Sequence, residues 1–592
     1  MNKMPIINII LPVIALGFTG CQKELGYTGF VDPGAAAETT ISLSTDKAVY
    51  APGETVEFSA SEMPAGAIYV RYMHLGEMVG EEQALSGTSW SWTAPSEDFK
   101  GYMAEVYQRS ASGEDILATI AVDVSSDWKK FPRYGFLATF NEMSADACDA
   151  VISNLNRLHI NGVQFQDWHW KHHWPLAQDK TTLEPLETYI DIASRSTSLS
   201  TIRNYISSIH SYGMKAIFYN LCFGALDDAA EDGVKEEWYI FKDQGHVTKD
   251  VHQLSAPFKS SIYLVDPANT QWQKYLGEKN DAVYEHLDFD GYQIDQLGSR
   301  GNVYDYNGNS VDLATGYASF IEAMKVLHPD KDLIMNAVSS YGAEQILGTG
   351  NVEFAYNELW DSEDQFTSLR SVIEANKRYG GEDMQTVFAA YMNYTKADNT
   401  GTFNTPGVLL TDAVIFALGG SHLEMGEHML CKEYFPNSNL GMSKELQEAI
   451  ISYYDFLTAY QNILRDGGSF NEVSVASTDG KMNIKSWEPA TGNVITLCRE
   501  NGNLQAIHLL NFSQANSTSW RDMDGSMPEP ALITDAALEI AADKDVAAVW
   551  MASPDIDGGA HKVLPFTQDG GKISITVPSL KYWDMIVIEY EN

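Results

Sequence analysis

The chain has 592 residues, too many for one domain, and 44% of them are hydrophobic, which allows large buried cores. Its 80 acidic residues outnumber 39 basic ones, giving a formal net charge of −41. This balance argues against nucleic acid or an anionic membrane surface as a partner, because phosphate binding requires clustered Lys and Arg. The five cysteines form no CxxC pair. Four of them are expected to be ordinary buried or half-buried thiols: Cys148, Cys222, Cys431 and Cys498.

The N-terminus has the pattern of a bacterial lipoprotein signal. A basic head precedes the apolar stretch "IINIILPVIALGF", which is short for a membrane span, and a small-residue cleavage region follows. We expect residues 1–21 to be a lipoprotein signal peptide, with cleavage before Cys21 and lipidation of its thiol; a plain signal peptide is the alternative. Gln22 favours outer-membrane retention, on either face, and this lipid is the only membrane contact expected. Residues 22–38 are Gly/Ala-rich and are expected to form a tether.

Two segments are predicted to consist of β-strands without helices. Residues 39–126 contain short alternating runs separated by Pro, Gly and Asp, which is typical of an immunoglobulin-like β-sandwich. Residues 466–592 return to the same rhythm and predict a C-terminal β-sandwich. The runs in the first segment are "TTISLS", "APGETVEFSA", "AIYVRYM", "SWSWTAP", "GYMAEVYQR" and "ILATIAVDV"; those in the second are "KMNIKSW", "NVITLCR", "LQAIHLLN", "VAAVWMA", "KISITV" and "WDMIVIEY".

Between them, residues 127–465 alternate strand-like and helix-like segments. Helical spacing of apolar residues is clear in "LSTIRNYISSIHSYGMK" and "ATGYASFIEAMKVLHPD". Eight strands alternating with helices predict a (β/α)₈ barrel, so the fold class is a multidomain α/β protein with a central TIM barrel between two β-sandwiches. The eight runs are residues 133–140, 161–166, 215–220, 291–295, 332–337, 353–358, 385–391 and 413–420.

Several of these runs end in a polar side chain. In "DFDGYQIDQLGSR", Tyr292 and Ile294 suit a buried strand, yet the run ends in Asp295, and a buried carboxylate without partners is costly. Catalytic groups of (β/α)₈ barrels stand at the carboxyl ends of the strands, which gives such a residue a purpose. The polar residues at strand ends are Asp167, Asn220, Asp295, Asn336 and Glu358.

Two carboxylates on different strands indicate glycoside chemistry, in which one attacks the anomeric carbon and the other protonates the leaving oxygen. We expect Asp295 and Glu358 to be this pair. Trp360, beside Glu358, would help to desolvate it and raise its pKa, as suits a general acid. The loop "QFQDWHWKHHWP" (164–175) gathers three Trp and three His, and flat rings complement the faces of sugars.

Plainer interpretations apply to each of these features. A lone Asp at a strand end is more often a helix cap than a catalyst. The His cluster could bind a metal, but no HExxH is present, and the acidic and His side chains of "HLEMGEH" (422–428) line the cleft or pair with neighbours. The sequence contains no nucleotide-binding loop and no G-x-S-x-G. We therefore expect no metal and no cofactor.

The barrel segments "FPRYGFLATF", "INGVQFQDWHWKHH", "FDGYQIDQLG", "YNELW" and "GGSHLEMGEHMLCKEYFPN" together resemble glycoside hydrolase family 66, the dextranases and cycloisomaltooligosaccharide glucanotransferases. The resemblance covers roughly residues 40–590. It implies a retaining, endo-acting attack on α-1,6-linked glucan (dextran), with Asp295 as nucleophile and Glu358 as acid/base. Gln166 departs from the pattern, which would have an aromatic residue there.

The resemblance also implies a set of substrate-binding residues, to which the strand-end positions add two more. The residues that it implies are Asp167, Trp168, Tyr219, Asn220, Gln293 and Glu424, and those added are Asn336 and Trp360.

Three other functions remain open at this point. Cyclising members of the family resemble dextranases interrupted by an inserted carbohydrate-binding module, and only about twenty residues separate the seventh and eighth strand segments, so hydrolysis is favoured over cyclisation. An exo-acting α-glycosidase would usually carry an Asp as its acid on strand six, where this sequence has Glu358. A surface lipoprotein that binds glucan without cutting it is the alternative from another class.

Overall fold

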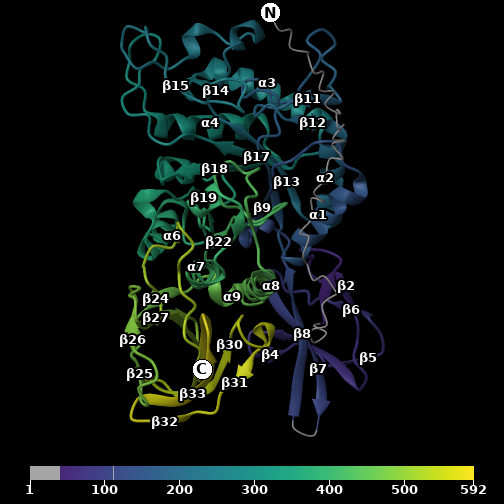
Figure 1. Cartoon of the computed structure of the whole chain (residues 1–592), viewed down its shortest axis with the longest axis vertical. Helices are drawn as coiled ribbons and strands as arrows, with labels where there is room; N and C mark the ends of the chain where they lie inside the picture. Colours follow the sequence, from purple (N-terminus) through teal and green to yellow (C-terminus); the bar gives the residue numbers. More distant parts are fainter. Residues whose placement is uncertain (1–40, 111–112, 592) are drawn as a thin grey trace, which may run out of the picture.

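The computed structural model describes residues 41–110 and 113–591. The expected signal peptide, Cys21 and the tether lie outside these residues. Helices and parallel strands fill the upper and middle parts of Figure 1, and two strand-rich domains lie below them, one purple and one yellow. Among the described residues, no helix has the length and apolar character needed to cross a membrane.

The central domain is a (β/α)₈ barrel, as predicted. Within the described residues, its eight strands are parallel and lie side by side in chain order. A parallel bridge between Phe136 on the first strand and Gly426, just beyond the eighth, closes the ring. The strands are β9 (Tyr134–Leu137), β10 (Gly162–Phe165), β13 (Lys215–Leu221), β17 (Gly291–Asp295), β18 (Asp332–Val338), β19 (Ala355–Glu358), β20 (Thr386–Ala389) and β22 (Ser421–His422).

Helices follow the strands around the outside of this barrel. They are α1 (Ala145–Arg157), α2 (Leu199–Ser211), α3 (Thr270–His286), α4 (Leu313–Leu327), α5 (Ala343–Gly348), α6 (Phe366–Gly380), α7 (Thr405–Ala417), α8 (Lys444–Ala459) and α9 (Gln461–Leu464). Long loops at the carboxyl ends of the strands carry short additional strands: β11 (Thr188–Ile190), β12 (Ser196–Ser198), β14 (Gly224–Ala225), β15 (Val251–His252), β16 (Ile262–Leu264), β21 (Gly401–Thr402) and β23 (Leu440–Gly441).

The prediction for the eighth strand was wrong. Most of residues 413–420 belongs to helix α7, and the true strand is the two-residue β22 that follows. Asn404 caps the helix by accepting a hydrogen bond from the backbone N–H of Gly407. Because the barrel and the C-terminal domain bury every residue from Gly407 to Ala417, the helix has no polar face, and its apolar run cannot be told from a buried strand by periodicity.

The N-terminal domain packs two antiparallel sheets against each other around an apolar core. All six predicted runs form strands in it. One sheet contains β1 (Leu43–Thr45), β2 (Thr55–Ala60) and β6 (Ser89–Thr93). The other contains β3 (Ile68–His74), β4 (Glu77–Met78), β5 (Gln83–Leu85), β7 (Lys100–Ser110) and β8 (Gly113–Val124).

The C-terminal domain also has two facing sheets with an apolar core between them. Its six predicted runs form strands, and the other five strands named below were not anticipated. The larger sheet contains β24 (Ser469–Asn471), β26 (Ile484–Ser486), β27 (Asn493–Asn501), β28 (Leu504–Phe512), β30 (Val546–Ala552), β31 (Lys562–Val563) and β34 (Trp583–Tyr590). The smaller contains β25 (Val475–Ser477), β29 (Ile533–Ala541), β32 (Thr567–Asp569) and β33 (Lys572–Leu580). The exact domain boundaries stay predictions.

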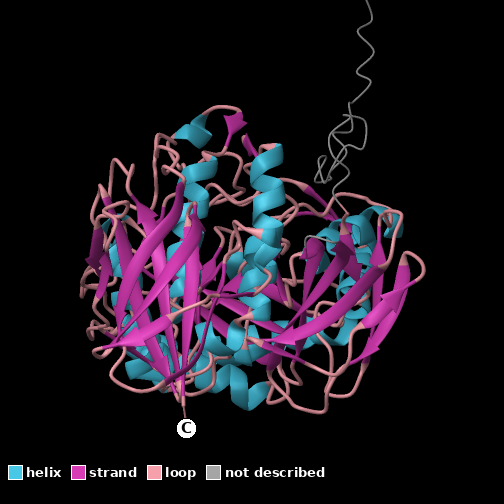
Figure 2. Ribbon diagram, turned by 90° about the horizontal axis from the view of Figure 1, so that it is seen from below, coloured by secondary structure: helices cyan, strands magenta, loops and turns pink. Residues whose placement is uncertain are grey.

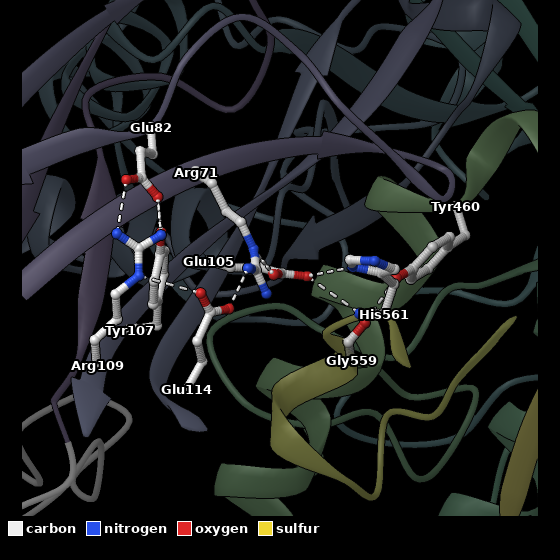
Figure 3. Close-up of polar contacts among 9 residues, drawn as sticks. All are labelled: Arg71, Glu82, Glu105, Tyr107, Arg109, Glu114, Tyr460, Gly559 and His561. Atoms are coloured by element: carbon white, nitrogen blue, oxygen red, sulfur yellow. Dashed lines mark hydrogen bonds and ion pairs between the residues drawn. The ribbon is translucent and has the colours of Figure 1, made fainter. Parts of the chain in front are cut away.

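The two sandwiches lie side by side with helices between them (Figure 2). Hydrogen bonds and ion pairs connect the two domains (Figure 3). The buried carboxylate of Glu105 accepts a hydrogen bond from Arg71 at 2.7 Å within its own domain and one from the backbone N–H of His561 at 3.1 Å in the other. Burial alone would raise the pKa of Glu105, but the contacts with His561 and Arg71 outweigh it and lower that pKa. The Tyr460 hydroxyl, on the barrel side, donates to the Gly559 carbonyl at 2.8 Å.

Candidate active site

The strand alternation of β17 explains how a carboxylate comes to stand at its end. Tyr292 points towards the helices, where its ring stacks on Phe218 and meets Phe320 edge-on. Its neighbours Gln293 and Asp295 point the other way and line a cavity at the carboxyl ends of the barrel strands. The charge at the end of this run therefore faces solvent-accessible space and polar partners.

Strand β18 lies between β17 and β19, and it places Asn336 between the two predicted catalytic carboxylates. The Asn336 Nδ2 group donates to Asp295 Oδ1 at 2.8 Å and to Glu358 Oε2 at 2.9 Å. Since both oxygens bond the same nitrogen, they are at most about 5.7 Å apart, the sum of the two distances. Asp295 and Glu358 thus face the same small space.

Each carboxylate has further donors of its own. Asp295 Oδ2 accepts from the Tyr219 hydroxyl at 2.7 Å, and its Oδ1 also accepts from the backbone N–H of Gln296 at 2.8 Å. Glu358 Oε1 accepts from the Tyr391 hydroxyl at 2.8 Å. Asp295 therefore receives three donors and Glu358 two, which favours the charged form more strongly at Asp295.

The electrostatics of the two acids differ accordingly. Burial raises the pKa of Glu358 to about 7, and the nearby charge of Asp295 adds to the rise, although Asn336 and Tyr391 oppose it. Burial also raises the pKa of Asp295, against the lowering effect of its three donors. Near neutral pH this arrangement favours a charged Asp295 beside a Glu358 that is protonated in a large fraction of molecules.

A cavity of about 480 Å³ surrounds the pair. Besides the two acids, it is lined by polar side chains that include Gln164, Gln166, Asp167, His172, Tyr219, Gln293, Asn336, Arg300 and Glu433. Among the described residues, the buried side-chain oxygens of Gln164, Gln293 and Asn336 have no hydrogen-bond partner. Buried polar atoms are normally satisfied, so these acceptors suit a ligand rich in hydroxyl groups.

Aromatic rings form much of the remaining wall. Trp360, Tyr391, Tyr434 and Phe435 line the cavity together with Phe258. The rings of Phe258 and Tyr434 meet edge-on at 6.1 Å, although they come from different loops. Apolar rings beside unsatisfied amide oxygens are the combination that binds a sugar ring and its hydroxyl groups together.

The structure brings seven of the ten predicted site residues to this cavity: Asp167, Tyr219, Gln293, Asp295, Asn336, Glu358 and Trp360. Burial raises the pKa of Asp167 to about 7. Sequence reasoning missed the contributions of Tyr391, Glu433, Tyr434 and Phe435, which lie on loops without a regular pattern.

Three predicted site residues lie elsewhere, which corrects the prediction that they border the cavity. Trp168 is fully buried beneath the strand ends, where its Nε1–H donates to the Tyr219 carbonyl. Asn220 is buried and donates to the His172 carbonyl. Glu424 is 1% exposed and accepts from the Tyr454 hydroxyl.

The Trp- and His-rich loop is likewise mostly core, not an exposed sugar platform. Trp168, His169, His173 and Trp174 are all buried. His172 alone among its Trp and His side chains lines the cavity within the described residues. Its pKa is lowered to about 4 by burial, so it is neutral at physiological pH.

Two groups of side chains in the described residues have a composition that could hold a metal ion: His173, Asp228 and Asp232, and Asp412, His422 and Glu424. In the first, Asp232 already bonds the ammonium groups of Lys171 and Lys180 at 2.6 and 2.5 Å. In the second, the His422 Nδ1 atom lies 2.8 Å from Asp412 and 3.3 Å from Glu424, so the imidazole already contacts both carboxyl groups. Neither group lines the cavity that contains Asp295 and Glu358.

Fold and site together define a class: (β/α)₈ barrels with paired carboxylates on the fourth and sixth strands, in a cavity of amides and rings. The profile of "Glycosyl hydrolase family 66" matches residues 45–587, and the chain belongs to this family. The resemblance noted in the sequence is thereby confirmed.

The individual relatives are named as two kinds of enzyme. A cycloisomaltooligosaccharide glucanotransferase from Niallia circulans is 28% identical over 714 aligned positions, covering 92% of this chain and 72% of the relative. A dextranase from Streptococcus salivarius is 23% identical and covers 83% of this chain and 68% of the relative. The crystal structure of a Paenibacillus sp. cycloisomaltooligosaccharide glucanotransferase, complexed with cycloisomaltoheptaose, matches with a TM-score of 0.84 at 25% identity. That match covers 92% of this chain and 99% of the other.

Proposed function

We propose that the protein is a retaining endo-dextranase, which cuts α-1,6-glucosidic linkages within dextran and releases isomaltooligosaccharides. The observation that carries the proposal is the bridge from Asn336 to both carboxylates, which keeps their nearest oxygens within about 5.7 Å. Retaining glycosidases hold their two carboxyl groups about 5–5.5 Å apart, whereas inverting enzymes need roughly 6.5–9.5 Å to admit a water molecule.

In the first step, the carboxyl group of Glu358 gives its proton to the glycosidic oxygen as the bond from the anomeric carbon to that oxygen breaks. Asp295 attacks the same carbon, so that a covalent glucosyl ester forms and the leaving chain departs as an alcohol. In the second step, the Glu358 carboxylate takes a proton from water, whose oxygen displaces Asp295. Two displacements at one carbon restore the original α-configuration.

Cyclisation or transfer is the second candidate, since the transferase from Niallia circulans is a more similar relative than the dextranase. A sugar hydroxyl would then replace water in the second step. Hydrolysis is favoured because this chain lacks segments that the transferase carries. The alignment with the transferase spans 714 positions, more than the 592 residues of this chain, so the transferase carries segments absent here. Only residues 390–420 separate β20 from β22, too few for an inserted module.

Digestion of dextran, followed by chromatography of the products, tests the proposal. We expect a ladder of linear isomaltooligosaccharides whose new reducing ends are α-anomers in early NMR spectra. Cyclic products would support the transferase, glucose alone an exo-acting enzyme, and binding without cleavage a non-catalytic glucan-binding protein. Early β-anomers would contradict retention.

Matched variants assign the roles. Asp295→Asn should abolish turnover while dextran binding remains, and Glu358→Gln should slow turnover about 10²–10⁴-fold. Glu322→Gln, an exposed carboxylate on the outer helix α4, serves as control and should leave the rate unchanged. Full activity in Asp295→Asn would refute the assignment.

We also propose that the protein is an outer-membrane lipoprotein anchored through Cys21. The sequence pattern around that cysteine supports this proposal, and nothing in the described residues bears on it.

A further inference from the structure

A loop of the C-terminal sandwich reaches the rim of the barrel near the active site. It connects β28 to β29, and hydrogen bonds join its middle to the segments that follow β19 and β20. The Trp520 indole donates to the Glu363 carbonyl at 2.6 Å, and the backbone N–H of Asn393 donates to the Arg521 carbonyl at 2.9 Å. The position of this loop is therefore fixed from both sides.

Arg521, at the centre of that loop, directs its guanidinium group at two rings of the barrel. Its side chain is buried, and the guanidinium carbon lies 5.5 Å from the ring centre of Trp360 and 5.1 Å from that of Tyr394. Nη1 bonds Asp361 at 2.6 Å. Nε and Nη2 have no hydrogen-bond partner among the described residues, which leaves cation–π contact with the rings as the second interaction of this group.

Both rings belong to the surroundings of the catalytic pair. Trp360 lines the cavity, two residues after Glu358, and its ring lies 5.6 Å from that of Tyr391, which bonds Glu358. The Tyr394 hydroxyl donates at 2.8 Å to Glu433, another residue of the cavity wall. Arg521 contacts Trp360 and Tyr394 but does not line the cavity. It therefore affects the position of the cavity wall without contacting a bound ligand.

We propose that Arg521 is a positioning residue for substrate binding: it fixes the ring of Trp360 against the cavity, so that the C-terminal sandwich forms part of the glucan-binding site. This inference rests on the proposed function. A ring held in one orientation binds a sugar without first losing its own freedom, so the contribution of Arg521 should appear in affinity for glucan and not in the chemical step.

The test compares Arg521→Gln with wild type on dextran. We expect KM to rise about five- to thirtyfold, the factor that corresponds to one contact of cation–π strength, while kcat stays within about twofold. Arg521→Lys keeps the charge but not the planar group that stacks on rings, so a smaller rise in KM is expected from it. If Arg521→Gln does not fold, the KM of Arg521→Lys tests the proposal instead. A KM equal to that of wild type in the variant that is measured would overturn the proposal.

Arg370→Gln is the matched control. Arg370 also places its guanidinium on a ring of the C-terminal sandwich, 4.6 Å from the centre of Phe470, but it lies outside the catalytic cavity. Loss of this contact should affect stability only. A similar loss of stability in both variants, with KM unchanged in Arg521→Gln, would show that Arg521 has a merely structural role.

A readout without substrate separates this inference from the proposed function. The near-ultraviolet circular dichroism band of Trp360 is identified by its disappearance in Trp360→Phe. We expect Arg521→Gln to lose the same band and Arg370→Gln to retain it. If wild type neither binds nor cuts dextran, the proposed function fails. The dichroism result still decides whether Arg521 positions Trp360, and an unchanged band would refute it.

Discussion

Replacement of Asn336 by Ala tests the central feature of the site, one amide that serves two acids. The amide hydrogen bonds stabilise the charged forms of both Asp295 and Glu358 and so lower both pKa values. Removing them must raise both. The proposed mechanism requires Asp295 to be charged and Glu358 to be protonated, so the acid and alkaline limbs of the pH profile should both move to higher pH.

The size of the alkaline shift follows from the bond that is lost. A hydrogen bond to a charged group contributes about 1.5–3 kcal/mol, and 1.36 kcal/mol corresponds to one pH unit, so about one to two units are available. Water can enter the cavity of about 480 Å³ and restore part of this interaction. We therefore expect the limb set by Glu358, with its pKa of about 7, to rise by about one unit.

The assay is kcat/KM on dextran from about pH 4 to about pH 9, for wild type, Asn336→Ala and a control. The control is Gln293→Ala, which removes an amide from the same cavity but has no hydrogen bond to either acid in the described structure. It should weaken substrate binding and leave both limbs in place. Unmoved limbs in Asn336→Ala, or equal shifts in both variants, would refute the reasoning.

Three further outcomes are expected. Tyr391→Phe removes a bond that lowers only the pKa of Glu358, so the alkaline limb alone should move up, by about half to one unit; movement of the acid limb as well would contradict this. Gly426→Ala would place a Cβ 2.4 Å from the Phe136 carbonyl where the barrel closes, and overpacking of that kind should lower the apparent melting temperature by about 2–10 °C in calorimetry. Cys21→Ala should move the protein from the membrane to the soluble fraction and abolish incorporation of labelled fatty acid; retention in the membrane would exclude the lipid anchor.

The sequence predicts those parts of the fold in which buried and exposed residues alternate in a regular pattern along the chain. Strand β17 is an example: Tyr292 and Ile294 face the helices, and Gln293 and Asp295 face the cavity, so a period of two reveals the strand and which of its residues reach the site. The apolar stripes of the segments that form helices α2 and α4 made the alternation of strands and helices visible in the same way. The polar residue that ends such a strand is visible in the sequence for the same reason.

The sequence does not show which residues from other parts of the chain surround a given helix or side chain. Helix α7 is buried all round, so its pattern carries no information about which face meets the barrel. Trp168 and Trp174 are core residues beneath a loop, and no local pattern separates a ring that packs inward from one that faces a ligand. Tyr391 bonds Glu358 from the segment that follows the neighbouring strand β20, a relation that depends on the register between β19 and β20.

The same limit explains why two acids of similar sequence context acquire different properties. Asp295 and Glu358 each end a buried strand, yet the first receives three hydrogen-bond donors and the second two. Apart from the adjacent backbone N–H of Gln296, those donors come from β13, β18 and the segment after β20, and therefore only a closed barrel can assemble them. The proposed division of labour between nucleophile and acid would thus be a property of the ring of strands, because the side chains that bond the two acids are distant from them in the chain.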